Sequence, residues 1–114
     1  MMPYEKREAW RRCHELVLAV YPATNSWPRP ELYGLTSQIR RAAVSAAANI
    51  AEGAAKRGPR EFRRYLDISF GSLSEVSYLL RVARDLHYLT EQAYEALEIV
   101  RTRPAKSLGS CIHP

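Results

Sequence analysis

The most constraining feature of the sequence is the stretch of residues 33–53, YGLTSQIRRAAVSAAANIAEG. Its apolar residues recur at helical spacing, and half of them are alanines: Leu35, Ile39, Ala42, Ala43, Ala46 and Ile50. At 3.6 residues per turn these positions fall on one face of a helix, where alanine permits a neighbouring helix to approach closely. We expect a helix that begins at an N-cap of Thr36 or Ser37 and ends at Gly53.

A second stripe along this helix is entirely polar and consists of Gln38, Ser45, Asn49 and Glu52. Buried polar groups need hydrogen-bond partners, so such a helix belongs inside a bundle. The candidate network between this helix and the next one comprises Gln38, Arg41, Asn49, Glu52, Ser72 and Glu75. Its functional interpretation is a catalytic or ligand site. We favour a structural network, in which a buried Glu75 carboxylate requires a cation or several donors.

Three further helices are predicted. The first covers residues 4–21 and ends at Pro22, because proline cannot continue the hydrogen-bond ladder. Its inward face consists of Trp10, Cys13, Val17 and Val20. The third helix covers residues 59–86 and carries a heptad seam of Phe62, Leu66, Ser69, Leu73, Val76, Leu80 and Ala83. The fourth begins at a Thr90 cap and is closed by Pro104.

Four helices with short connections and no strand alternation predict an all-α fold, an antiparallel up-and-down four-helix bundle. The expected bundle domain is residues 1–103, and residues 104–114 are expected to form a loose C-terminal tail. A proline-rich connection follows the first helix. Within it, Trp27 and Tyr33 are expected to cover one end of the bundle.

The composition excludes several classes of protein. A chain of 114 residues, 46% of them hydrophobic, is long enough for one soluble domain. No apolar run approaches the ~20 residues that span a bilayer, so no membrane role is expected. The N-terminus has no apolar signal core, which predicts a cytoplasmic protein in which Cys13 and Cys111 stay reduced. Lysine and arginine outnumber acidic residues by 17 to 12, a net charge of +5 that is compatible with nucleic-acid binding.

The arrangement of polar residues predicts no catalytic site. Di-iron bundles use Glu-x-x-His motifs, but Arg11 and Arg84 precede His14 and His87 by three residues. The third histidine, His113, lies in the expected tail. No serine has a histidine partner at a readable spacing. We therefore expect no metal, no cofactor, no small-molecule substrate and no enzymatic activity.

Basic residues form two groups, one around the start of the third helix and one on the first helix. The first group is Lys56, Arg57, Arg60, Arg63 and Arg64, and the second is Lys6, Arg7, Arg11 and Arg12. The functional interpretation is a surface that binds phosphate groups of nucleic acid. The alternative is a solvated helix start that keeps the protein soluble. Cations oppose the dipole at a helix N-terminus, so they do not stabilise the helix there.

Two motifs, YGLTSQIRRAAVS followed by NIAEG, and EFRRYLDISFGSLSE, resemble the four-helix-bundle family of 23S rRNA intervening-sequence proteins. The accessory protein of diversity-generating retroelements is similar to the same bundle. The resemblance covers residues 10–89 and implies a small bacterial protein that forms a homopentameric ring, with nucleic-acid binding proposed for members. The sequence departs from the family at Ala46-Ala47, where an Ile-Pro pair is usual, and in the fourth helix, which normally runs longer.

Taken together, these features predict a non-enzymatic, self-assembling bundle that binds nucleic acid, with structured RNA preferred over DNA. The alternative is a protein–protein assembly or adaptor module with no nucleic-acid role. The aromatic residues Phe70 and Tyr78 are expected on a mostly polar side of the third helix, where they are candidates for a contact between copies.

Overall fold

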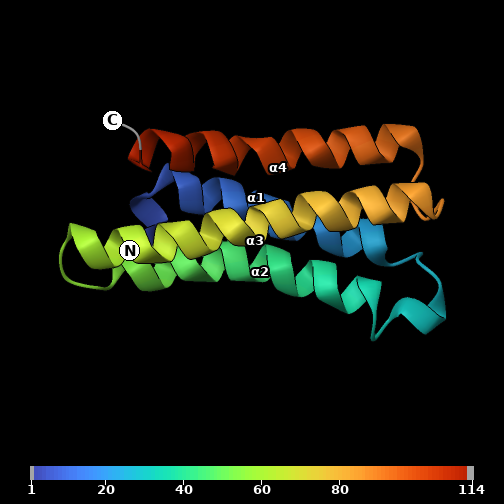
Figure 1. Ribbon diagram of the computed structural model, residues 1–114, viewed down its shortest axis with the longest axis horizontal. Helices are drawn as coiled ribbons and strands as arrows, with labels where there is room; N and C mark the ends of the chain where they lie inside the picture. Colours follow the sequence, from blue (N-terminus) through green and yellow to red (C-terminus); the bar gives the residue numbers. More distant parts are fainter. Residues whose placement is uncertain (1, 113–114) are drawn as a thin grey trace.

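The computed structural model describes the backbone of residues 2–112 and the side chains of residues 2–108. Four α-helices form most of this part of the chain (Figure 1): α1 spans Glu8–Thr24, α2 spans Leu35–Ala54, α3 spans Pro59–Asp85 and α4 spans Glu91–Ile112. Two short 3₁₀-helices, η1 at Pro3–Lys6 and η2 at Arg29–Glu31, precede α1 and α2. Residues 2–112 contain no β-strand. The predicted all-α fold is confirmed.

The four helices form an elongated bundle of 43 × 25 × 23 Å. Helices α1 and α3 each pack against both α2 and α4, and successive helices run in opposite directions (Figure 1). One end of the bundle therefore holds the N-termini of α1 and α3 together with the C-termini of α2 and α4. We call this the N-terminal end, because the described chain begins there.

The core lies between the four helices and follows the predicted seam of α3. Leu66, Ser69, Leu73, Val76, Leu80 and Ala83 are buried. The Ser69 hydroxyl donates a hydrogen bond of 2.6 Å to the carbonyl oxygen of Ala46 in α2, which satisfies this polar group inside the core. Phe62, at the start of the seam, is only half-buried. On α1 the core face is rotated from the predicted one, since Leu16 is fully buried and Trp10 is half-buried.

Two predicted helix ends are wrong because both prolines lie inside helices. Pro22 lies in the last turn of α1, which continues to Thr24. Pro104 lies inside α4, which continues to Ile112, so the segment expected as a tail is helical as far as it is described. Proline in a helix removes one backbone hydrogen bond and costs about 3 kcal/mol. In α4 this cost is offset by apolar contacts, because Pro104 and Leu108 are both fully buried.

Both ends of α2 also differ from the prediction. The N-cap is Gly34, and Thr36 is buried as the second residue of the helix. The backbone amide of Leu35 has no partner within the helix, and it donates a hydrogen bond of 3.2 Å to Glu31 Oε1. Gly53 does not end the helix. It is buried near the end of α2, and an added Cβ would lie 2.8 Å from Tyr65 Cβ, so the glycine permits close contact with α3.

The connection between α1 and α2 was predicted to cover the opposite end of the bundle with Trp27 and Tyr33, and only Trp27 does so. Trp27 is buried, and its ring lies 5.9 Å from that of Tyr88. Tyr88 donates a hydrogen bond of 3.0 Å to Glu31, which links the connection to the turn before α4. Tyr33, expected to cover the same end, is 93% exposed. The Thr90 cap of α4 is confirmed by a bond of 3.0 Å from Ala93 N to Thr90 Oγ1.

Cys13 is buried in the core as a free thiol. Burial raises the pKa of this thiol from 9.0 to about 12, and a hydrogen bond with Ser69 opposes that rise. The thiol is therefore protonated at neutral pH, which makes it a poor nucleophile. The side chain of Cys111 and the whole of His113 lie outside the described residues. None of the described helices combines the length and apolar character needed to cross a bilayer.

Candidate nucleic-acid interface

The two basic groups meet at the N-terminal end of the bundle. Arg7, the residue before α1, places its guanidinium carbon 4.3 Å from the centre of the Phe62 ring on α3. A hollow of about 300 Å³ lies between them and the α2–α3 connection, and its lining includes Arg7, Lys56, Gly58 and Phe62. Residues about 50 positions apart in the sequence are thus brought to one surface by the antiparallel packing.

Ion pairs neutralise part of the predicted basic surface. Arg12 contacts Glu8 at 3.7 Å and Glu15 at 3.3 Å, and Arg64 contacts Glu61 at 3.8 Å. Their positive charges are therefore partly compensated within the protein. Exposed ion pairs contribute little to stability, so these contacts mainly reduce the local positive potential.

Other cations at this end have no carboxylate partner among the described residues; they are Lys6, Arg7, Arg11, Lys56, Arg57 and Arg60. Arg11 donates to the carbonyl oxygen of Glu5 at 3.0 Å, and Lys56 lies 5.8 Å from the centre of the Tyr65 ring. Arg63 lines a separate hollow of about 590 Å³ on α3 with Arg60 and Asp67. Six cations without a carboxylate partner among the described residues therefore gather at one end of the bundle. We refer to these six residues as the basic end.

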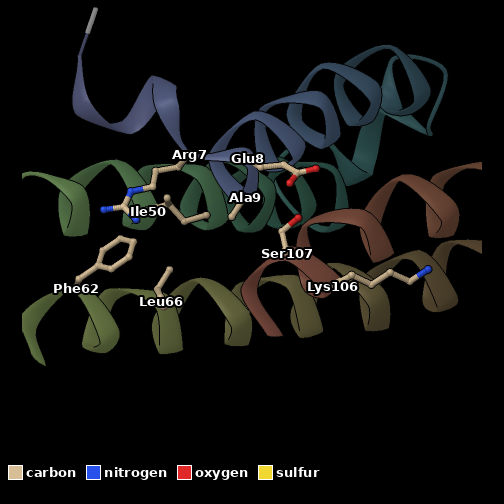
Figure 2. Close-up of a pocket in the computed structure, with 8 residues that line it drawn as sticks. All are labelled: Arg7, Glu8, Ala9, Ile50, Phe62, Leu66, Lys106 and Ser107. Atoms are coloured by element: carbon tan, nitrogen blue, oxygen red, sulfur yellow. The ribbon is translucent and has the colours of Figure 1, made fainter. Parts of the chain in front are cut away.

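A cavity of about 320 Å³ adjoins the basic end (Figure 2). It is lined by Arg7, Glu8, Ala9, Ile50, Phe62, Leu66, Lys106 and Ser107. Four of these side chains are apolar, while the rim carries charged and hydroxyl groups. In Figure 2 the Arg7 guanidinium lies over Phe62, Ser107 points towards the start of α1, and Lys106 extends away from the cavity. Lys106 was expected in the tail and Phe62 in the core, so the sequence did not assign either residue to this surface.

The polar network predicted between α2 and α3 forms only around Ser45. Asn49 donates to the Ser45 carbonyl at 2.8 Å, and the Ser72 hydroxyl donates to the Ser45 hydroxyl at 3.0 Å. The other members, Gln38, Arg41, Glu52 and Glu75, are exposed. Glu75 is therefore not the buried carboxylate that the sequence predicted. Glu75 lies on a face of α3 that is exposed to solvent.

The remaining candidates for chemistry are dispersed. His14 stacks on Trp10 with ring centres 5.0 Å apart and lies on the exposed side of α1. Across the described residues, no three His, Cys, Asp or Glu side chains gather closely enough to hold a metal ion. Phe70 and Tyr78 are 41% and 66% exposed on α3, as predicted for a polar side of that helix.

A model of the family described as 23S rRNA-intervening sequence protein matches residues 5–109, almost the whole chain. The chain belongs to this family. The resemblance found in the two sequence motifs is therefore confirmed, and the four-helix architecture agrees with it. A search of curated proteins finds no significant match. The family description states no biochemical activity, so a function can be inferred only from the geometry of this protein.

Proposed function

We propose that this family member is a non-enzymatic, cytoplasmic, self-assembling bundle that binds nucleic acid, preferably structured RNA, through the basic end. The observation that carries the proposal is the convergence of six cations without carboxylate partners on one surface. Unpaired lysine and arginine side chains are what binding to phosphates requires, since each contact releases a condensed counterion. Arginine also forms two parallel hydrogen bonds with one phosphate.

Fluorescence anisotropy of a labelled structured RNA, titrated at several salt concentrations, tests this proposal. We expect affinity to fall steeply with salt, and the triple variant Lys56→Ala, Arg57→Ala, Arg60→Ala to bind at least about tenfold more weakly. The logarithmic salt slope should also decrease by about two to three in the variant, because about one unit is lost for each phosphate contact.

The matched control removes three positive charges far from the basic end: Arg29→Ala, Arg41→Ala and Arg81→Ala. These arginines are exposed, and they lie on η2, the middle of α2 and the second half of α3. We expect this variant to keep the salt slope of the wild type. Equal losses in both triple variants would mean that only net charge matters, which contradicts a localised interface. No binding at low salt would remove the nucleic-acid proposal.

Self-assembly is supported by apolar side chains on the outer surface of α3. Ile68, Phe70 and Tyr78 on α3 are each more than two-fifths exposed, and exposed apolar side chains that lie close together mark interaction sites. The same observation favours the second candidate function, a protein–protein assembly or adaptor module without a nucleic-acid role. An apolar interface responds weakly to salt, so the RNA titration distinguishes the two functions.

Light scattering after size-exclusion chromatography tests the assembly. We expect a mass that is a multiple of the 13.0 kDa chain, with five copies implied by the resemblance to the family. Replacing both Phe70 and Tyr78 with lysine should shift the protein towards the monomer, because two charges would be buried at the contact. Leu18→Lys is the control, since Leu18 is 60% exposed, between the values for Phe70 and Tyr78, but lies on α1. An unchanged mass in the double variant would exclude this surface as the contact.

A further inference from the structure

The cavity beside the basic end has an apolar interior that is built by three helices. Ala9, Ile50 and Leu66 are buried residues of three different helices, and all three line it. Its volume of about 320 Å³ lies at the lower end of the ~300–1,000 Å³ typical of small-ligand sites. An apolar interior with a cationic rim fits a flat, weakly polar group that is attached to an anion.

The half-buried Phe62 connects this cavity to the hollow beside the α2–α3 connection. Both spaces are lined by Phe62 and Arg7, and the second space also contains Lys56. A phosphate in the second space would lie next to two cations that have no carboxylate partner among the described residues. A group attached to that phosphate would reach the apolar cavity along the Phe62 ring.

We propose that the cavity accepts one unpaired nucleobase of the bound nucleic acid, while the flanking phosphates contact Arg7 and Lys56. The inference rests on the proposed function and specifies the kind of nucleotide that is bound. Unstacked bases bind by packing on aromatic rings and arginine planes, and both groups are present in the Arg7–Phe62 pair. A base within an intact duplex cannot enter the cavity.

Polar groups at the rim are placed to contact the edge of such a base. Glu8 supplies a carboxylate acceptor from the first turn of α1, and Ser107 supplies a hydroxyl group from α4 (Figure 2). Glu8 also contacts Arg12 at 3.7 Å, and the oxygens of a carboxylate can accept hydrogen bonds from amino groups of a base. Lys106 lies beside Ser107 and adds a positive charge to the rim.

The test compares two labelled RNAs with equal numbers of phosphates, a hairpin with an unpaired loop and a blunt, fully paired duplex. Anisotropy at one salt concentration should show about tenfold tighter binding of the hairpin, the effect expected from stacking of one base. A fluorescent adenine analogue, 2-aminopurine, in the loop should be quenched on binding because its ring becomes stacked.

Two variants change the cavity without changing the net charge. Ser107→Leu fills the cavity from α4, and Phe62→Leu keeps an apolar side chain but removes the ring. Each should lower hairpin affinity to the level of the duplex and leave duplex affinity unchanged. Ser74→Leu is the matched control, because Ser74 is an exposed serine on α3 outside the cavity. Circular dichroism melting of all variants verifies that they are folded.

The outcomes separate this inference from the proposed function. Equal, salt-sensitive binding of hairpin and duplex would overturn the nucleobase cavity and leave phosphate binding in place. A preference for the hairpin that persists in both cavity variants would also overturn it. If neither RNA binds at low salt, the proposed function fails and the inference fails with it.

Discussion

Replacing Leu108 with alanine is expected to lower the free energy of unfolding by about 2–5 kcal/mol and the melting temperature by roughly 10–20 °C. Leu108 is fully buried in the core, one turn after Pro104 in α4. Truncation removes buried apolar area and leaves a cavity that the surrounding helices fill only in part. Urea unfolding and thermal melting followed by circular dichroism measure both quantities.

The neighbouring substitution Lys106→Ala is the control. Lys106 is exposed on the same helix, so we expect its removal to change stability by no more than about 0.5 kcal/mol. If residues 104–114 formed a loose tail, Leu108→Ala and Lys106→Ala would be equally harmless. That result would contradict the continuous α4 and the core contact of its last turns.

The substitution Gly53→Val is expected to destabilise the protein by about 1–3 kcal/mol through overpacking. An added Cβ at Gly53 would lie 2.8 Å from Tyr65 Cβ and 3.0 Å from Phe62 Cδ1, so α2 and α3 would have to separate. Valine adds two further methyl groups, and its branched Cβ restricts the rotamers that could avoid the contact. Urea unfolding at equilibrium measures the loss.

Gly71→Val tests the same chemical change on a neighbouring helix. Gly71 is exposed in α3, and an added Cβ would meet no atom within 4 Å. Valine has a slightly higher helix propensity than glycine, so stability should stay the same or rise by a few tenths of a kcal/mol. Similar destabilisation by both substitutions would show that backbone flexibility matters at Gly53 and that close helix contact does not. Because Gly53 packs on Phe62, the first variant should also disturb the cavity of the basic end.

The candidate site was only partly predictable from the sequence. The clusters of lysine and arginine are visible as local runs, and their exposure follows from their chemistry. The sequence did not show which of these cations lack a carboxylate partner. In the structure Arg12 and Arg64 are paired with glutamates of their own helices. The Arg7–Phe62 contact joins α3 to the start of α1. No local pattern encodes a contact between residues that far apart.

The four helices were predictable from the sequence, since spacings of three and four residues set which side of a helix is apolar, although the buried face of α1 is rotated from the predicted one. This holds most clearly for α3, where the predicted seam is buried almost throughout. The position at which a helix ends depends less on the local sequence. Pro22 and Pro104 both predict a stop, and both lie inside helices, while α2 ends one residue after the predicted stop at Gly53.

Tertiary packing explains why α4 continues past Pro104 and why Gly53 is tolerated near the end of α2, whereas Pro22 is exposed and has no such offset. A proline or glycine lowers helix stability by about 1–3 kcal/mol, an amount that the burial of one or two side chains can offset. At Pro104 the offset comes from its own burial and that of Leu108, and at Gly53 from close contact with α3. The sequence by itself therefore determined four amphipathic helices and a basic surface. Only the assembled bundle decided how far α4 extends and that a cavity lies between Arg7, Phe62 and Ser107, because both depend on contacts between distant segments.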